Sequence, residues 1–149
     1  MGRLRVLILV PDLSSSSPIQ GAVALAGYLH SRGVDVIVGN LEDRGSGTDF
    51  IQNELRSAGV ESYCFDMPGW LGTLRFGKLK RYVRDMEFDV VLSFNFRSDT
   101  MNWLLGKSTV RVCSIRENYD AWARRLGWKG GLAGNLMLRI WNNVDGLMT

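Results

Sequence analysis

Apolar runs of strand length alternate along this chain with segments in which apolar residues recur at helical spacing, and this alternation most restricts the possible fold. Residues Arg5–Val10 are almost wholly apolar, as in strands buried on both faces of a sheet. Four more strands are expected at residues 34–38, 61–65, 89–94 and 110–115, and a sixth begins at Asp145. This βαβ order predicts an α/β fold with three α/β/α layers and a parallel sheet of about six strands.

Helices are expected between these strands. Ser17 as the cap, Pro18 at the first helical position and Gln20 reaching back form a capping box for the first helix, which Gly33 ends. The second helix is expected to start at Asp49 and end at Gly59, and a short one to cover residues 99–105. The predicted buried stripes are Ala22, Leu25, Ala26 and Leu29 in the first helix, Leu79, Tyr82, Val83 and Met86 in the third, and Leu132, Leu136, Met137, Ile140 and Trp141 in the last.

Length and composition indicate one folded domain. The chain has 149 residues, of which 46% are hydrophobic. No apolar run approaches the roughly 18–20 residues that span a bilayer, and the start of the chain lacks a signal-peptide cleavage pattern. Cys64 and Cys113 lie in apolar runs, so we expect reduced core thiols of a cytoplasmic protein, with a disulfide between them as the alternative.

The residue types exclude several kinds of site. His30, the only histidine, falls at the far end of the first helix and is expected to be exposed and distant from any site. Neither cysteine has a second soft ligand at a useful spacing, so no metal site is expected. The net charge is +3, but residues 1–74 sum to −3 and residues 75–149 to +6. This division predicts an anionic ligand or surface on the basic half, although no motif for reading nucleic acid accompanies it.

In an open parallel sheet, ligands bind beyond the carboxyl ends of the strands. After the first strand, backbone N–H groups and the positive end of the next helix can hold a phosphate. The predicted phosphate loop consists of Ser16, Ser17, Gln20 and Gly21. The segment reads S-S-S-S-P-I-Q-G in place of G-x-G-x-x-G, which argues against dinucleotide binding and leaves a flexible serine loop with a helix cap as the alternative.

Charged and polar side chains follow the fourth and fifth strands. Arginine can bind a phosphate or a carboxylate in a bidentate manner, and carboxylates accept hydrogen bonds from sugar hydroxyls. The predicted binding residues are Asn95, Arg97, Asp99, Arg116, Glu117 and Asn118. A structural arginine–aspartate pair that closes the edge of the sheet is the alternative.

Two basic segments contain interleaved aromatic and aliphatic residues, a composition typical of contact with anionic membranes. The predicted membrane-docking residues are Trp70, Arg75, Lys78, Lys80, Arg81 and Arg84 in the first segment and Trp122, Arg124 and Arg125 in the second. A solvated helix face and a subunit interface remain as alternatives for both segments.

The order of these motifs resembles the amino-terminal domain of the GT-B glycosyltransferases, in particular glycosyltransferase family 4. The matching segments are residues 5–13, 21–38, 89–99, 111–120 and 144–149. The resemblance implies that residues 1–149 form a Rossmann-like, acceptor-side domain of a retaining transferase. Such an enzyme moves a sugar from a nucleotide-sugar donor to a lipid-linked or polysaccharide acceptor, here peripherally at the cytoplasmic face of a membrane.

In this family the carboxyl-terminal domain binds most of the donor and carries an E-x7-E pair, which this sequence lacks. The resemblance therefore implies a domain truncated at its carboxyl-terminal end, inactive and without a cofactor by itself, whose expected partner is the missing donor-binding domain in the same or a separate chain. No residue is assigned as catalytic. Many members have a histidine where this chain has Arg116, which shifts the expected role of Arg116 towards binding phosphate or an anionic acceptor.

Two other functions stay open at the level of sequence. One is a non-catalytic binding module or the partner subunit of a two-chain enzyme. The other is a nucleotide-dependent oxidoreductase or epimerase.

Overall fold

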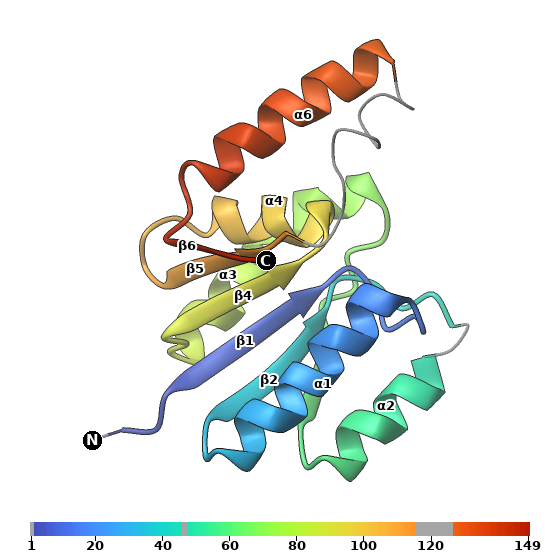
Figure 1. Ribbon diagram of the computed structural model, residues 1–149, viewed down its shortest axis with the longest axis vertical. Coiled ribbons are helices and arrows are strands. Elements are labelled where there is room, and N and C mark those ends of the chain that lie inside the picture. The colour runs from blue at the N-terminus through green and yellow to red at the C-terminus, as the bar shows by residue number, and fades with distance from the viewer. Residues whose placement is uncertain (1, 46–47, 116–126) are drawn as a thin grey trace.

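The computed structural model describes residues 2–45, 48–115 and 127–149. The elements, labelled as in Figure 1, are β1 (Arg5–Val10), α1 (Ser17–Ser31), β2 (Asp35–Asn40), α2 (Thr48–Ser57), β3 (Glu61–Cys64), the 3-10 helix η1 (Trp70–Arg75), α3 (Phe76–Asp85), β4 (Val90–Phe94), α4 (Phe96–Leu104), β5 (Val110–Ser114), α6 (Trp128–Trp141) and β6 (Gly146–Met148).

The strands form one parallel sheet in the order β3-β2-β1-β4-β5-β6, which confirms the predicted parallel α/β architecture. β1 pairs with β2 from Arg5↔Asp35 to Val10↔Asn40 and with β4 from Val6↔Val90 onward. The chain adds strands outward from β1 on one side, then crosses to β4 and adds strands on the other. The boundary between β1 and β4 is therefore the switch point of the sheet, where such folds bind ligands.

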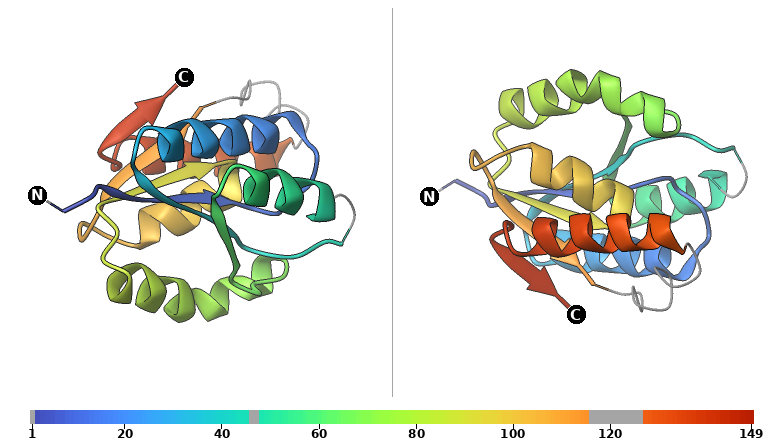
Figure 2. Two further views of the ribbon diagram at one scale, coloured as in Figure 1. Left: turned by 90° about the horizontal axis from the view of Figure 1, so that it is seen from below. Right: turned by 90° about the horizontal axis from the view of Figure 1, so that it is seen from above.

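Helices cover both faces of the sheet, as predicted (Figure 2). The alternation of side chains along β1 defines the two cores: Val6, Ile8 and Val10 pack with α1 and α2. Leu7 and Leu9 point to the other face and pack with α3 and α4. α6 packs beside α4, where its buried residues contact Cys113 of β5 in a smaller third cluster.

The structure corrects several local predictions. The cap of α1 is Ser16, whose side chain makes no capping bond, and Gln20 Nε2 donates to the Ser15 carbonyl, so the predicted capping box is wrong. α4 begins at Phe96 and not at residue 99, because Asn95, with φ 81°, turns the chain sharply at the end of β4. β2 begins one residue later than expected and ends at Asn40.

Two predictions of burial are also wrong. Cys64 is exposed because it ends the edge strand β3, whereas Cys113 is buried between β5 and α6; both thiols are free. Leu132, expected on the buried stripe of the last helix, is 64% exposed. His30 is exposed, as predicted. None of the helices in the described ranges is both long enough and apolar enough to span a bilayer.

The first testable prediction concerns Gly39, a buried residue of β2. A Cβ atom there would lie 2.7 Å from Phe65 Cε2 and 3.1 Å from Leu7 Cδ1. We expect Gly39→Ala to lower the free energy of unfolding in urea by about 1–3 kcal/mol, because the packed interior cannot accept the extra atom. The control is Gly27→Ala in α1, where the new Cβ meets Ala58 at an ordinary 3.5 Å. That variant is expected to be neutral or stabilising, and equal losses in both would contradict the packing argument.

Candidate functional site

The candidate site lies at the carboxyl edge of the sheet, where the loop after β1 and the turn after β4 meet at the switch point. Residues 11–16 connect β1 to α1, and Asn95 alone connects β4 to α4. Two helices therefore start beside one another at this edge, each on a different face of the sheet (Figure 2).

The loop after β1 is ordered by side-chain hydrogen bonds. Asp12, which is buried, accepts a bond at Oδ1 from the Ser14 backbone N–H at 2.9 Å. Ser14 Oγ donates to Ser16 Oγ at 3.2 Å, and Gln20 Nε2 donates to the Ser15 carbonyl at 3.0 Å. Ser15, Ser16, Ser17 and Gln20 are exposed and Gly21 is half-buried. Hydroxyl groups thus gather at the positive end of a 15-residue helix, a setting suited to a phosphate.

Asn95 has a positive φ of 81° with ψ 148°, a backbone conformation outside the left-handed helical region. Positive φ is uncommon for a residue with a side chain, and with ψ near 150° it is found almost only at glycine. The Asn95 carbonyl accepts the Asp99 backbone N–H at 2.9 Å, so Asn95 also starts the first turn of α4. Asn95 is half-buried, next to the switch point.

A cluster of four charged residues, Asp12, Glu42, Arg44 and Arg97, connects three loops of this edge; we call it the edge charge cluster. Arg97 Nη1 lies 3.1 Å from Glu42 Oε2, and both side chains are about nine-tenths buried. Arg97 Nη2 donates to the carbonyls of Met67 and Gly69. Arg44 Nε lies 2.6 Å from Glu42 Oε1 and 3.5 Å from Asp12 Oδ2.

The environment keeps Glu42 ionised. Burial opposes its charge, but a bond from the Gly69 backbone N–H, a bond from Arg44 and the charge of Arg97 outweigh that penalty. Together they lower the pKa of Glu42 below its ordinary value. The guanidinium of Arg97 is thus held by protein groups, as in the structural-pair alternative, but its partner is Glu42 and not an aspartate.

Asp99, predicted as a ligand-binding residue, lies in the interior beneath α4 and is fully buried. Its Oδ1 accepts a 2.7 Å bond from Ser93 Oγ, and Asn102 Nδ2 donates to Ser93 Oγ and to the carbonyls of Val91 and Val112. Burial raises the pKa of Asp99 to about 7, although hydrogen bonds from Ser93, Cys113 and Trp141 act in the opposite direction. We therefore leave Asp99 out of the proposed binding site.

Sequence reasoning missed this buried polar network and the edge charge cluster. Ser93 interrupts an apolar strand and Asn102 interrupts the apolar positions of α4, which is the signal that could have revealed the network. The predicted residues Arg116, Glu117, Asn118, Trp122, Arg124 and Arg125 lie outside the described residues. Within the described ranges, no group of three or more histidine, cysteine, aspartate or glutamate side chains could hold a metal ion.

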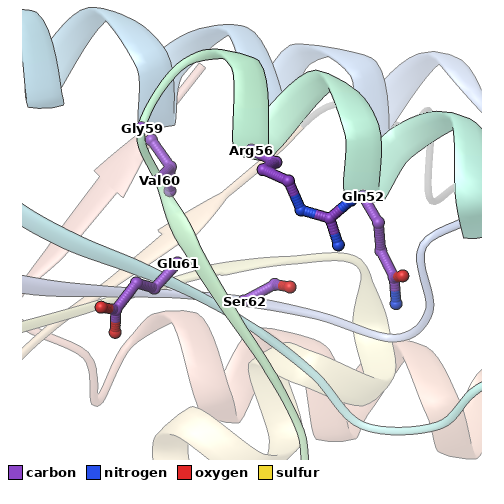
Figure 3. Close-up of a pocket in the computed structure, with 6 residues that line it drawn as sticks. All are labelled: Gln52, Arg56, Gly59, Val60, Glu61 and Ser62. Carbon is purple, nitrogen blue, oxygen red and sulfur yellow. The ribbon is translucent and has the colours of Figure 1, made fainter.

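A groove of about 380 Å³ lies elsewhere, between α2 and the edge strand β3 (Figure 3). Gln52 and Arg56 extend from α2 towards Ser62 of β3. Arg56 Nη1 donates to Asn53 Oδ1 of its own helix at 3.2 Å. The lining residues Glu61 and Ser62 form the amino end of β3, away from the carboxyl strand ends at the switch point, so we do not assign this groove as the functional site.

Comparisons with known proteins identify solved structures that share this fold. No family model matches the chain, and no curated protein is similar to it in sequence. Among solved structures, it is similar to MurG of Acinetobacter baumannii, with a TM-score of 0.55 and 15% identity over 84% of this chain. It is also similar to a glycosyltransferase of Rickettsia africae, with a TM-score of 0.59 and 13% identity over 87% of this chain.

A third similar structure is UGT73P12 of Glycyrrhiza uralensis in complex with glycyrrhetinic acid 3-O-monoglucuronide, with a TM-score of 0.52 and 17% identity over 82% of this chain. The chain spans 40%, 35% and 30% of these three proteins, respectively. The chain thus has a Rossmann-like α/β fold that recurs as one part of GT-B glycosyltransferases.

The second prediction tests the edge charge cluster. We expect Arg97→Met to lower the free energy of unfolding by about 3–5 kcal/mol, because it leaves the buried Glu42 carboxylate and two carbonyls without their partner. The matched control is Arg44→Met, whose side chain contacts the same carboxylate but is 64% exposed. It is expected to cost less than about 1 kcal/mol. Similar losses in urea unfolding would contradict a special role for Arg97.

The third prediction concerns pH. The folded-state pKa of Asp99 is about 7 and its ordinary value is 3.8, so the folded state binds the extra proton between these values. Stability is therefore lost as the pH rises through 7. Between pH 5 and pH 8, the free energy of unfolding of the wild type should fall by roughly 2–3 kcal/mol relative to Asp99→Asn, which stays neutral. Urea unfolding at both pH values measures this, and parallel pH profiles for the two proteins would refute it.

Proposed function

We propose that the chain is the acceptor-side domain of a retaining, nucleotide-sugar-dependent glycosyltransferase, with a lipid-linked or polysaccharide acceptor. The observation that carries the proposal is the grouping of Ser15, Ser16, Ser17 and Gln20 at the start of α1 beside Asn95, at the switch point of a sheet shared with glycosyltransferases. The chain spans only part of those proteins, which supports a second, donor-binding part in the complete enzyme.

In this proposal, the start of α1 approaches the phosphates of the donor, and Gln20 and Gly21 lie next to them. The carboxamide of Gln20 now donates to the Ser15 carbonyl and is exposed, so it can turn to a phosphate oxygen at the cost of one surface hydrogen bond. Asn95 forms the acceptor side, together with Arg116, Glu117 and Asn118, which stay predictions.

The carboxylates described at this edge suit a reaction that needs no protein base. Asp12 and Glu42 are engaged in the edge charge cluster, and Asp99 is buried. The exposed Asp66 pairs with Arg75, and Asp43 accepts bonds from the Gly45 N–H and the Thr48 hydroxyl. In a retaining front-face transfer, the bond from the sugar C1 to the donor phosphate breaks and the bond from C1 to the acceptor oxygen forms on the same face. The acceptor hydroxyl proton passes to the leaving phosphate oxygen, so the protein supplies binding and orientation.

A non-catalytic partner subunit is the second candidate, favoured by the same partial coverage of the neighbours. The two candidates differ in one measurable property. A partner subunit leaves nucleotide sugars unbound, whereas the acceptor-side domain contacts their phosphates.

The fourth prediction tests this contact by NMR titration of the 15N-labelled chain with UDP-glucose, GDP-mannose and ADP-glucose. One of these donors is expected to shift the backbone amides of residues 14–21 and Asn95, with a dissociation constant in the millimolar range typical of an incomplete site. Gln20→Ala should weaken binding several-fold, because one charge-assisted hydrogen bond contributes about 1.5–3 kcal/mol net and the surface bond to the Ser15 carbonyl that it replaces contributes about 0.5–1.5 kcal/mol.

The matched control is Gln52→Ala, a glutamine in the groove beside β3 (Figure 3). This variant should bind as the wild type does. Amide shifts centred on residues 52–62, or no shifts with any donor at 10 mM, would reject the proposed phosphate contact.

A further inference from the structure

η1 presents two leucines to solvent. Leu71 is 82% exposed and Leu74 is 85% exposed, the highest values among the large hydrophobic side chains described as exposed. A 3-10 helix has three residues per turn, so side chains at positions i and i+3 lie one above the other on the same face. Leu71 and Leu74 therefore form one apolar ridge.

The opposite side of η1 is fixed to the protein. Gly72 is buried, and its N–H donates to the carbonyls of Pro68 and Gly69 at 3.0 and 3.2 Å. A Cβ atom at this position would overlap the Met67 carbonyl, so only glycine allows this approach. Arg75 Nη1 donates to the backbone and the carboxylate of Asp66 at 2.9 and 2.7 Å. The leucines thus point outward because the other face of η1 is held in place.

α3 follows η1 directly and supplies positive charge. Residues 75–85 contain five basic groups and one acidic group, Asp85, which pairs with Arg84. Arg75 pairs with Asp66, and Lys78 Nζ donates to the Phe65 carbonyl. Lys80 and Arg81 are exposed, and neither has an ion pair with any described residue.

Lys80 and Arg81, together with Arg84 of the Arg84–Asp85 pair, line a groove between α3 and the turn that follows α4. Its volume is about 320 Å³, and its walls include Lys80, Arg81, Arg84 and Ser108 over an apolar floor of Val83 and Leu105. In both views of Figure 2, α3 is the outermost layer on its face of the molecule. We call the surface formed by Leu71, Leu74 and this groove the η1–α3 face.

We propose that the η1–α3 face docks on an anionic lipid bilayer, with Leu71 and Leu74 inserted at the acyl boundary and with Lys80, Arg81 and Arg84 in contact with lipid phosphates. An apolar ridge next to a cluster of basic side chains matches both layers of a membrane surface, hydrocarbon below and phosphate above. Lysine is depleted from the cores of protein–protein interfaces. The unpaired Lys80 therefore favours contact with a hydrated layer of lipid phosphates over contact with a protein partner. This docking does not depend on sugar transfer.

The fifth prediction uses vesicle co-sedimentation of the full chain. The wild type should bind vesicles of 70% phosphatidylcholine and 30% phosphatidylglycerol at least tenfold more tightly than vesicles of phosphatidylcholine alone, and 0.5 M NaCl should remove most of the difference. Lys80→Gln/Arg81→Gln should weaken binding to the anionic vesicles about 25-fold, since each basic residue contributes roughly fivefold. Leu71→Ser/Leu74→Ser should weaken it at least about tenfold.

Matched controls carry the same changes on other faces. Leu132→Ser/Leu138→Ser removes two exposed leucines of α6, and Arg32→Gln/Arg56→Gln removes two exposed charges from the α1 and α2 face. Both should bind as the wild type does. All variants alter exposed side chains, so unchanged circular dichroism and Tm verify that each is folded.

Four outcomes would overturn the docking proposal, three of them in the vesicle assay. These are equal, salt-insensitive binding to both kinds of vesicle, equal losses in the control variants, or displacement from vesicles by millimolar glycerol phosphate, which would indicate a site for a soluble phosphate. Light scattering tests a subunit interface: a wild-type dimer that Leu71→Ser/Leu74→Ser converts to monomer also overturns the proposal. Each of these results leaves the titration with nucleotide sugars unaffected, so the two proposals fail independently.

Discussion

The fold depends on the burial of β1 on both of its faces. Residues 6–10 are 5% exposed or less, and they face α1 and α2 on one side and α3 and α4 on the other. Because β1 is central, it sets the register of β2 and β4 and leaves its own carboxyl end at the switch point. The loop after it lies at that position, which is why the uncharged serine segment at residues 14–17 becomes the candidate phosphate site.

Sequence patterns predicted the architecture because parallel strands buried on both faces appear as uninterrupted apolar runs. The errors occurred where exposure depends on sheet order, which no single run reveals. Cys64 lies in an apolar-looking segment, but its strand forms the edge of the sheet. Leu132 matches the helical spacing of the last helix, but it is exposed in the first half of that helix, whereas the buried Met137 and Ile140 lie in the second half.

The sequence predicted the position of the candidate site but not the contacts among its charged side chains. Parallel strand ends meet at one edge, so the loop residues and Asn95 could be grouped from the sequence alone. The partners of charged side chains come from distant segments: Arg97 contacts Glu42, 55 residues earlier, and Asp99 contacts Ser93 inside the core. Their shared position after the fourth strand suggested that Arg97 and Asp99 act together, whereas the fold directs Arg97 to the edge and Asp99 to the interior.

Arg97 also has a mechanical consequence. Its guanidinium donates to the carbonyls of Met67 and Gly69, and the Gly69 carbonyl also accepts the Gly72 N–H between Leu71 and Leu74 of the ridge. One buried side chain thus connects the start of α4, beside the switch point, with the loop that carries the ridge. If the ridge is inserted in a bilayer, this connection keeps the phosphate loop at a constant distance from the membrane surface. An acceptor anchored in the membrane would then have to extend across this fixed distance to arrive at the phosphate loop.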